Sequence, residues 1–159
     1  MRILGIDPGF DRLGYGIVEL QGSQATWVNH GCVQTSKEDD YSFRLQQVRD
    51  GLKRAIAEFS PEVVAVEDLF FQNNAKTAMR VGMARGVILL AIADAGLPLI
   101  EVTPNQVKQG LTGWGAADKK AMQQMVQMTL KLKEVPRPDD AADALAIAIV
   151  GGLFFRHPR

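Results

Sequence analysis

The first third of the chain alternates short apolar runs with polar or glycine-containing breaks. Three runs rich in apolar and β-branched residues are present, at Arg2–Asp7, Tyr15–Leu20 and Ala25–Val33. Pro8 ends the first run, the turn-like residues Gly9–Gly14 follow it, and residues 21–23 separate the second run from the third. Short runs with breaks of this kind are typical of antiparallel strands, so the sequence predicts three of them.

Beyond these runs, apolar residues recur at three- and four-residue steps, which is the period of an amphipathic helix. This pattern predicts a helix over Ser42–Phe59, which Pro61 ends. The same pattern predicts four more helices, at about Thr77–Ala95, from Pro104, at about Asp118–Leu132, and from about Pro138 into the 150s. Thr103 stands three residues before Gln106, and these residue types begin a helix with a capping box.

Two further strands are predicted between the helices. Glu62–Asp68 is a nearly continuous β-branched run, which is typical of a central buried strand, and Leu97–Val102 is predicted as another buried strand. Phe70–Thr77 is polar with two aromatic residues and is predicted as a loop. Three antiparallel strands followed by β-α-β crossovers predict an α/β fold in one domain over residues 1–159, with helices on both faces of a mixed five-stranded sheet.

Charge is distributed unevenly along the chain although its sum is zero. The 159 residues include 18 Lys and Arg against 18 Asp and Glu. Residues 1–68 hold 7 basic and 11 acidic side chains, whereas residues 69–137 hold 9 basic and 4 acidic ones. A basic segment of this kind indicates a surface that faces a polyanion such as nucleic acid, although helix faces are commonly basic for solubility alone.

Composition restricts the compartment and the kinds of site. With 47% apolar and 23% charged residues, the chain resembles an ordinary soluble globular domain. The acidic Asp7 interrupts the apolar stretch that a secretory signal would need, and the longest apolar run, Val87–Ala93, is far shorter than a membrane span. We therefore expect a cytoplasmic protein without membrane association. The single cysteine, Cys32, excludes a disulfide within the chain and a four-cysteine zinc site.

Four acidic residues stand at the ends of predicted elements. Asp7 ends the first strand, Glu67 lies at the end of the fourth, and Asp140 and Asp143 lie three residues apart on one face of the last helix. Carboxylates that converge repel one another, and a hard divalent cation with oxygen ligands is the usual resolution. With only two histidines in the chain, such a set suits Mg²⁺ or Mn²⁺ better than zinc.

These acids also have structural interpretations. A carboxylate beside a proline can begin a turn, one at a strand end can face solvent, and acids in the first turn of a helix offset its dipole. The combination of four acids, and the alanine- and leucine-rich neighbours of Asp143, favour a metal site. Asp139 is a local alternative to Asp140, because it stands four residues before Asp143.

Several segments resemble, in order, the motifs of RuvC-type Holliday junction resolvases. They are Ile3–Gly9 with Gly14–Gly16, Val66-Glu67 with Phe70 and Ala84–Gly86, Gln106–Gln109 with Ala117–Lys120, and Asp140–Ala148. The resemblance covers nearly the whole chain. It implies a ribonuclease-H-like fold, which agrees with the order of strands and helices predicted from the pattern.

The resemblance also implies roles for individual residues. The metal-binding catalytic acids of the family, which hold two Mg²⁺ or Mn²⁺ ions, match Asp7, Glu67, Asp140 and Asp143. The family register favours Asp140 over Asp139, and it makes Asp7 the ligand shared between the ions.

DNA contacts are implied in the same way. Lys108 and Lys119 match positions that contact the phosphate backbone, and Phe70 matches an aromatic residue that stacks on bases opened at the crossover. Phe71 could share that task or pack in the core. Three further basic residues are predicted to contact DNA, namely Lys76, Arg80 and Lys120.

The family dimerises through its second helix, where this chain has Gly82 and Gly86 near Met79 and Met83. Packing of that face against the chain's own sheet is the alternative. The resemblance implies a homodimeric endonuclease that resolves four-way DNA junctions by paired symmetric nicks, leaving 5′-phosphate and 3′-hydroxyl ends, in homologous recombination and DNA repair. It also implies a branch-migration complex of the RuvA and RuvB type as a partner.

Three other functions fit part of the pattern. A related ribonuclease-H-like nuclease acting on another nucleic acid would use the same acids. The run Ile6–Gly9 followed by glycines also resembles the phosphate loop of actin-like ATPases, although that fold needs two such domains. A catalytically inactive junction-binding protein is disfavoured by the intact set of four acids.

Overall fold

The structure, a computed structural model, describes residues 1–68 and 75–156, except for the side chains of residues 75–77 and 156. Its elements follow one another in the predicted order β-β-β-α-β-α-β-α-α-α. The strands are β1 (Arg2–Asp7), β2 (Arg12–Gln21), β3 (Gln24–Gln34), β4 (Val63–Glu67) and β5 (Leu99–Val102). The helices are α1 (Tyr41–Phe59), α2 (Ala75–Asp94), α3 (Pro104–Thr112), α4 (Lys119–Thr129) and α5 (Asp139–Arg156).

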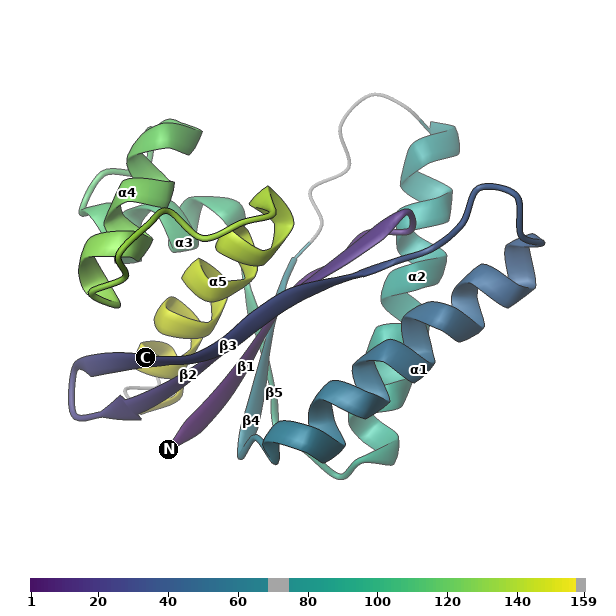
Figure 1. Ribbon diagram of the computed structural model, residues 1–159, viewed down its shortest axis with the longest axis horizontal. Helices are drawn as coiled ribbons and strands as arrows, with labels where there is room; N and C mark the ends of the chain where they lie inside the picture. Colours follow the sequence, from purple (N-terminus) through teal and green to yellow (C-terminus); the bar gives the residue numbers. More distant parts are fainter. Residues whose placement is uncertain (69–74, 157–159) are drawn as a thin grey trace.

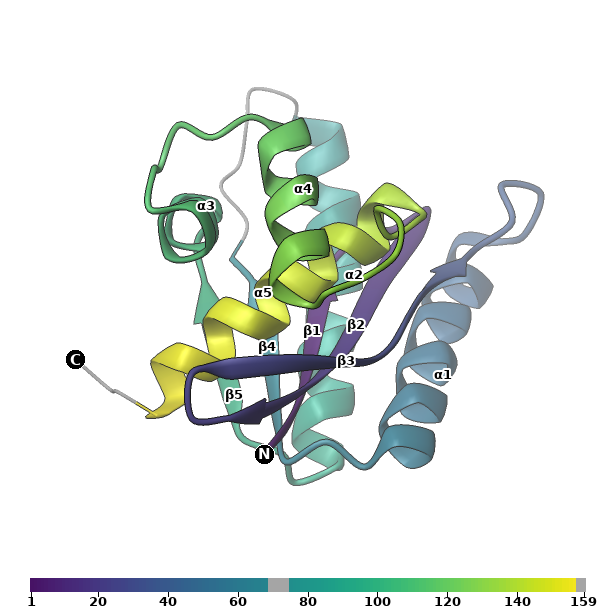
Figure 2. The same cartoon turned by 60° about the vertical axis from the view of Figure 1, so that its left-hand side comes forward.

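The five strands form one mixed sheet in the order β3-β2-β1-β4-β5. β2 is antiparallel to β1 and β3, whereas β4 is parallel to β1 and β5. Helices α1 and α2 lie on one side of the sheet, and α3, α4 and α5 lie on the other (Figure 1). The turned view shows α5 running diagonally across the strands between the sheet and α4 (Figure 2). The predicted α/β architecture is confirmed.

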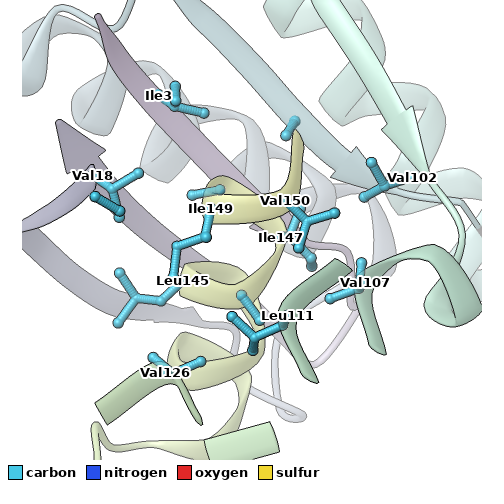
Figure 3. Close-up of a cluster of buried hydrophobic side chains, with 14 of the residues drawn as sticks. Ile3, Val18, Val102, Val107, Leu111, Val126, Leu145, Ile147, Ile149 and Val150 are labelled. Atoms are coloured by element: carbon cyan, nitrogen blue, oxygen red, sulfur yellow. The ribbon is translucent and has the colours of Figure 1, made fainter. Parts of the chain in front are cut away.

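Side chains along the strands alternate between two cores. Ile3 and Ala65 belong to the core around α5, whereas Leu4 and Val64 belong to the core under α1 and α2. In the first core, the side chains of α5 lie between strand residues and residues of α3 and α4 such as Leu111 (Figure 3). Helix α5 is apolar nearly all round because it is buried on several sides. Even so, no helix within the described residues is long and apolar enough to cross a membrane.

Two glycines allow α5 to lie directly on the sheet. A Cβ added at Gly5 in β1 would overlap the main-chain oxygen of Ala144, and one added at Gly14 in β2 would overlap that of Asp140. Since glycine alone lacks this atom, the first turns of α5 reach the sheet surface here. The amino end of α5 is thereby fixed over the end of β1.

Several boundaries differ from those predicted, among them the start of α2, which begins at Ala75 within the segment predicted as a loop. Arg12–Gly14, interpreted from sequence as part of a turn, extends β2 and pairs with β3. The strand predicted at Leu97–Val102 begins only at Leu99, which is 40% exposed, because β5 is the edge of the sheet and is not buried on both faces. Helix α4 ends at Thr129, three residues before the predicted Leu132. The capping box that begins α3 is present as predicted.

Candidate active site

The carboxyl ends of β1 and β4 place two acids side by side. These strands are parallel neighbours with Ile6 opposite Val66, so the next residues, Asp7 and Glu67, lie at the same edge of the sheet. Ile6 and Val66 point into the core under α1 and α2. Because side chains alternate along a strand, Asp7 and Glu67 point to the other face, toward α5.

Helix α5 brings two further acids to this edge. Gly14 pairs with Asp7 across β1 and β2, and it is also the residue whose missing Cβ makes room for Asp140. Asp143, three residues further along α5, lines a cavity of about 250 Å³ together with Glu67. We call Asp7, Glu67, Asp140 and Asp143 the acid cluster.

Burial and nearby carboxylates raise the pKa values of Asp7, Glu67 and Asp143. The pKa of Asp7 is raised to about 8, mainly by burial and then by the charges of Glu67, Asp143 and Asp140. The pKa of Glu67 is raised to about 7 by burial and by the charge of Asp143. Burial also raises the pKa of Asp143. A cation placed among these groups would relieve the repulsion and favour their ionised forms.

Basic side chains flank the acid cluster and pair with it. Lys119 Nζ lies 3.0 Å from a carboxylate oxygen of Asp139 and 3.6 Å from one of Asp143. The Arg12 guanidinium lies 3.6 Å from a carboxylate oxygen of Asp140. These cations compensate the acids of α5 from both sides.

Within the described part of the chain, no three His, Cys, Asp or Glu side chains are arranged as a ready set of metal ligands. The ion pairs of α5 give a physical reason, because two of the four acids are each paired with a basic side chain. The chemistry of the donors nevertheless fits a hard divalent cation. The acid cluster offers carboxylate oxygens alone, and its members already repel one another.

Asp139 and Asp140 are distinguished by their surroundings. The Asp139 side chain is 61% exposed, pairs with Lys119 and accepts a hydrogen bond of 3.0 Å from Gln123 Nε2. The hydrogen bond from Lys119 lowers the pKa of Asp139. Asp140 is 32% exposed, and its charge helps to raise the pKa of Asp7. Of the two, Asp140 therefore lies in the acid cluster and Asp139 lies at its margin.

The predicted DNA contacts lie at different distances from the acid cluster. Lys108 and Lys119 line the 250 Å³ cavity with Glu67 and Asp143, and the charge of Lys108 opposes the rise in the Glu67 pKa. Arg80 lines a different cavity, which it shares with Asp140. Lys120 is exposed on α4. Phe70, Phe71 and the Lys76 side chain lie outside the described residues.

Arg85 is a site residue to which sequence reasoning assigned no role. From α2, its Nη1 donates a 2.8 Å hydrogen bond to the main-chain oxygen of Glu67. Its Nη2 lies 3.3 Å from Asp68 and also pairs with Glu101. Arg85 thus fixes the carboxyl end of β4. The motif Ala84–Gly86 marked the segment, but no periodic pattern shows that an arginine will turn inward to bind main chain.

The exposed face of α2 does not pack against the sheet. A Cβ added at Gly82 or Gly86 would meet no atom of the described chain within 4 Å. Met79 and Leu90 on the same helix are 62% and 61% exposed. Among the described residues, Gly82 and Gly86 therefore do not pack against the sheet, although Met83 Sδ on the same face accepts a 2.9 Å hydrogen bond from the Tyr41 hydroxyl of α1.

A mixed five-stranded sheet with acids at the ends of β1 and β4 and in the first turn of the helix that crosses it defines a ribonuclease-H-like nuclease. A family model described as "Crossover junction endodeoxyribonuclease RuvC" matches residues 3–151. This chain belongs to the RuvC family of crossover junction endodeoxyribonucleases. Membership implies dependence on a divalent metal ion and excludes the ATPase interpretation.

Individual relatives agree with this membership. The "Crossover junction endodeoxyribonuclease RuvC" of Thermosipho melanesiensis is 53% identical over 148 residues, which cover 93% of this chain and 94% of that protein. The solved structure of Thermus thermophilus RuvC is similar with a TM-score of 0.90 and 39% identity, covering 98% of this chain and 96% of that one. A structure of T. thermophilus RuvC in complex with Holliday junction substrate is similar with a TM-score of 0.90 and 36% identity, covering 99% and 97%.

Proposed function

We propose that this chain, as one nuclease domain over residues 1–159, resolves four-way DNA junctions by paired symmetric nicks in homologous recombination and DNA repair. The observation that carries the proposal is the acid cluster at one edge of the sheet, flanked by Lys108 and Lys119. The T. thermophilus relative, which is described in complex with Holliday junction substrate, supports four-way DNA as the substrate.

In this proposal the acid cluster holds two Mg²⁺ or Mn²⁺ ions. Asp7 is the shared ligand, and its central position is supported by the effect of all three other acids on its pKa. Divalent ions held there would supply Lewis-acid chemistry, lowering the pKa of the attacking water and offsetting charge on the leaving oxygen. Attack of water on phosphorus breaks the bond to the 3′ oxygen, which takes up a proton. The products are a 5′-phosphate and a 3′-hydroxyl.

Lys119 and Lys108 are proposed to hold the phosphate that is cut. Lys119 lies 3.6 Å from Asp143, and both lysines line the cavity that Asp143 and Glu67 share. A phosphate seated there would place its non-bridging oxygens beside two ammonium groups. Charge-assisted contacts of this kind position the phosphate and stabilise the negative charge that develops on it.

The face of α2 that contains Met79, Gly82, Met83, Gly86 and Leu90 is proposed to bury against the same face of a second copy. Small residues four apart allow two helices to approach closely, and the exposed methionines and leucine supply apolar area. A two-fold dimer of this kind presents two acid clusters to a substrate with matching symmetry.

Three further parts of the proposal rest on the family. Phe70 stacks on bases opened at the crossover, a branch-migration complex of the RuvA and RuvB type is a partner, and the cytoplasm is the location. Base stacking on an aromatic residue contributes roughly 1–3 kcal/mol and tolerates any sequence. It would suit the unpaired centre of a junction.

The proposal is tested by comparing a synthetic four-way junction with a linear duplex of the same arm sequence, in Mg²⁺ or Mn²⁺. We expect paired nicks related by two-fold symmetry in the junction, with ends that a ligase seals. Asp7→Asn should abolish them, whereas Asp139→Asn, which changes the exposed neighbour of the acid cluster, should retain cleavage. Equal cutting of the linear duplex would contradict junction resolution and indicate a general nuclease.

A further inference from the structure

A second cavity is lined by Asp140 of the acid cluster and shares no lining residue with the one lined by Lys108. Its volume is about 770 Å³, and it is lined by the turn after β1, the end of β3 and part of α2. Pockets that hold whole organic ligands have volumes of roughly 300–1,000 Å³. Three basic side chains line this one, namely Arg12, Lys37 and Arg80.

A buried hydrogen-bond network fixes the floor of this cavity. The Arg44 side chain is only 8% exposed, pairs with Asp11 and donates from Nε to Thr35 Oγ1 at 3.0 Å. Thr35 Oγ1 donates to the Phe10 carbonyl at 3.0 Å, and the Arg44 guanidinium lies 4.2 Å from the centre of the Phe10 ring. A buried arginine is costly unless it is paired, and Arg44 is paired through Nε with Thr35 and through Nη2 with Asp11. The network ties the turn after β1 to the end of β3.

The charge of this cavity favours an anion. Two acids line this cavity, and each has a basic partner. Asp11 pairs with Arg44, and Asp140 pairs with Arg12 at 3.6 Å. Lys37 and Arg80 are exposed, and within the described residues neither has an acidic partner at ion-pair distance. Lys37 and Arg80 therefore remain available to a ligand, and Arg12 joins them when a cation engages Asp140.

Shared side chains connect this cavity to the acid cluster. Arg12 and Asp140 also line a shallow depression of about 640 Å³, which Lys119 borders. Lys119 in turn lines the 250 Å³ cavity together with Lys108. The result is a series of basic side chains that line three hollows beside the acid cluster, linked by the residues that these hollows share. We call it the basic track, and in order it contains Lys37 and Arg80, then Arg12, then Lys119 and Lys108.

We propose that the 770 Å³ cavity is a second binding site for the sugar-phosphate backbone of the strand that is cut, a few nucleotides away from the scissile phosphate. The inference rests on the proposed nuclease function. Its ligand is a phosphodiester chain, held by Lys37, Arg80 and Arg12 above a rigid floor. Two of these residues lie outside the basic segment 69–137 that the charge pattern indicated. Holding one strand on both sides of the acid cluster fixes which phosphate lies over the acids.

Lys37→Gln is the sharpest variant, because Lys37 lies in the cavity without contacting the acid cluster. Binding of a synthetic four-way junction is measured in an Asp7→Asn background, so that the DNA is not cut. We expect Kd to rise about fivefold, and the slope of log Kd against log salt to fall by about 0.9, since one phosphate contact is lost. The matched control is Lys53→Gln on α1, which removes an exposed lysine that pairs with Asp94 at 3.8 Å. It should leave both quantities unchanged.

A scan with single neutral methylphosphonates along the cut strand locates the contact. A methylphosphonate at one position away from the cut site should weaken junction binding by the Asp7→Asn protein. The same methylphosphonate should cause no further loss of binding in the protein that also has Lys37→Gln, because the contact is already absent. Additive losses at every position would overturn the proposal. If the wild-type protein cuts the junction but Lys37→Gln has the same Kd and salt dependence as Lys53→Gln, the second site is overturned and the proposed function is not. Failure of the wild-type protein to cut junctions overturns the proposed function itself.

Discussion

The surroundings of Asp7 in the folded chain oppose its ionisation. Asp7 is half-buried near three other carboxyl groups, and desolvation together with their charges raises its pKa from 3.8 to about 8. Between these two values the folded protein keeps a proton on Asp7 that the unfolded chain has released. Protons bound in excess by the folded state make the free energy of unfolding fall as pH rises. The contribution of Asp7 is therefore complete at acidic pH and is lost on approach to pH 8.

Asp7→Asn should remove this loss. With a chelator present, we expect the wild-type free energy of unfolding to decrease between pH 5 and pH 8 relative to that of Asp7→Asn. At pH 8 the variant should be more stable by on the order of 2 kcal/mol, about 4–8 °C in Tm. The measurement is thermal and urea unfolding at a series of pH values, with Asp139→Asn as the control that keeps the wild-type slope. Parallel pH profiles for the wild type and Asp7→Asn would contradict a half-buried, repelled carboxyl at this position.

At the scale of elements, α2 and β4 are joined through Arg85. Its guanidinium binds the Glu67 main-chain oxygen at 2.8 Å and the carboxylates of Asp68 and Glu101. Glu67 is the last residue of β4, and the next residue, Asp68, donates a 2.7 Å main-chain hydrogen bond to the Val102 oxygen of β5, so Arg85 adds a second support to this end of the strand. A planar guanidinium contacts several acceptors at once, which a lysine ammonium cannot do in the same geometry.

We therefore expect Arg85→Gln to lower the rate of junction cleavage about tenfold. It should also raise the Mg²⁺ concentration needed for half-maximal activity, because losing a group that orients a metal ligand weakens metal binding. Arg85→Lys should recover part of the rate, and junction binding should change little. Glu101→Gln is the control, because it removes a partner of Arg85 that is not part of the acid cluster. Metal dependence equal to that of the wild type, with a lowered Tm alone, would show that Arg85 is structural only.

The order of the elements could be predicted because each is coded locally, by periodicity and by breakers such as Pro61. The extension of β2 through Arg12–Gly14 could not be predicted, since a charged residue and a glycine look like a turn until β3 and α5 are in place. Likewise, β5 is apolar in sequence, and only the strand order shows that it is the exposed edge.

The acids of the site could be predicted from the sequence because they stand at the ends of strands and helices, next to apolar segments whose packing does not require a carboxylate. The roles of Arg44 and Arg85 are not visible, because each depends on contacts between elements distant in the chain. An isolated arginine in a helix is most often solvated, so its type and position carry no signal of a tertiary role.

At the scale of the whole molecule, the zero net charge is the sum of two separate features. The acid cluster is compensated by bound cations in the proposed function, and the basic track lines hollows that it shares with these acids. With the four acids offset, the remaining surface carries an excess of positive charge toward DNA. Association should therefore weaken steeply with salt even though the chain is formally neutral.

The exposed apolar face of α2 gives a prediction about assembly. Gly86 faces open space, and a Leu side chain there would separate two helices that cross at this point. Leu also has a higher helix propensity than Gly by nearly 1 kcal/mol, so Gly86→Leu should not weaken the monomer. We expect the wild type to sediment as a dimer at micromolar concentration and Gly86→Leu to dissociate at least tenfold more readily.

Gln124→Leu is the control for this variant, because it adds the same side chain at an exposed position of α4, on the other side of the sheet. It should sediment as the wild type does. In junction assays, Gly86→Leu should lose the simultaneous appearance of the two nicks before it loses single nicks, since each acid cluster is intact and only its pairing is changed. A Gly86→Leu protein that stays dimeric would place the contact between copies on another face. If the wild-type protein is monomeric at every concentration, the proposed dimer is wrong, and any paired nicks would come from two molecules that bind independently.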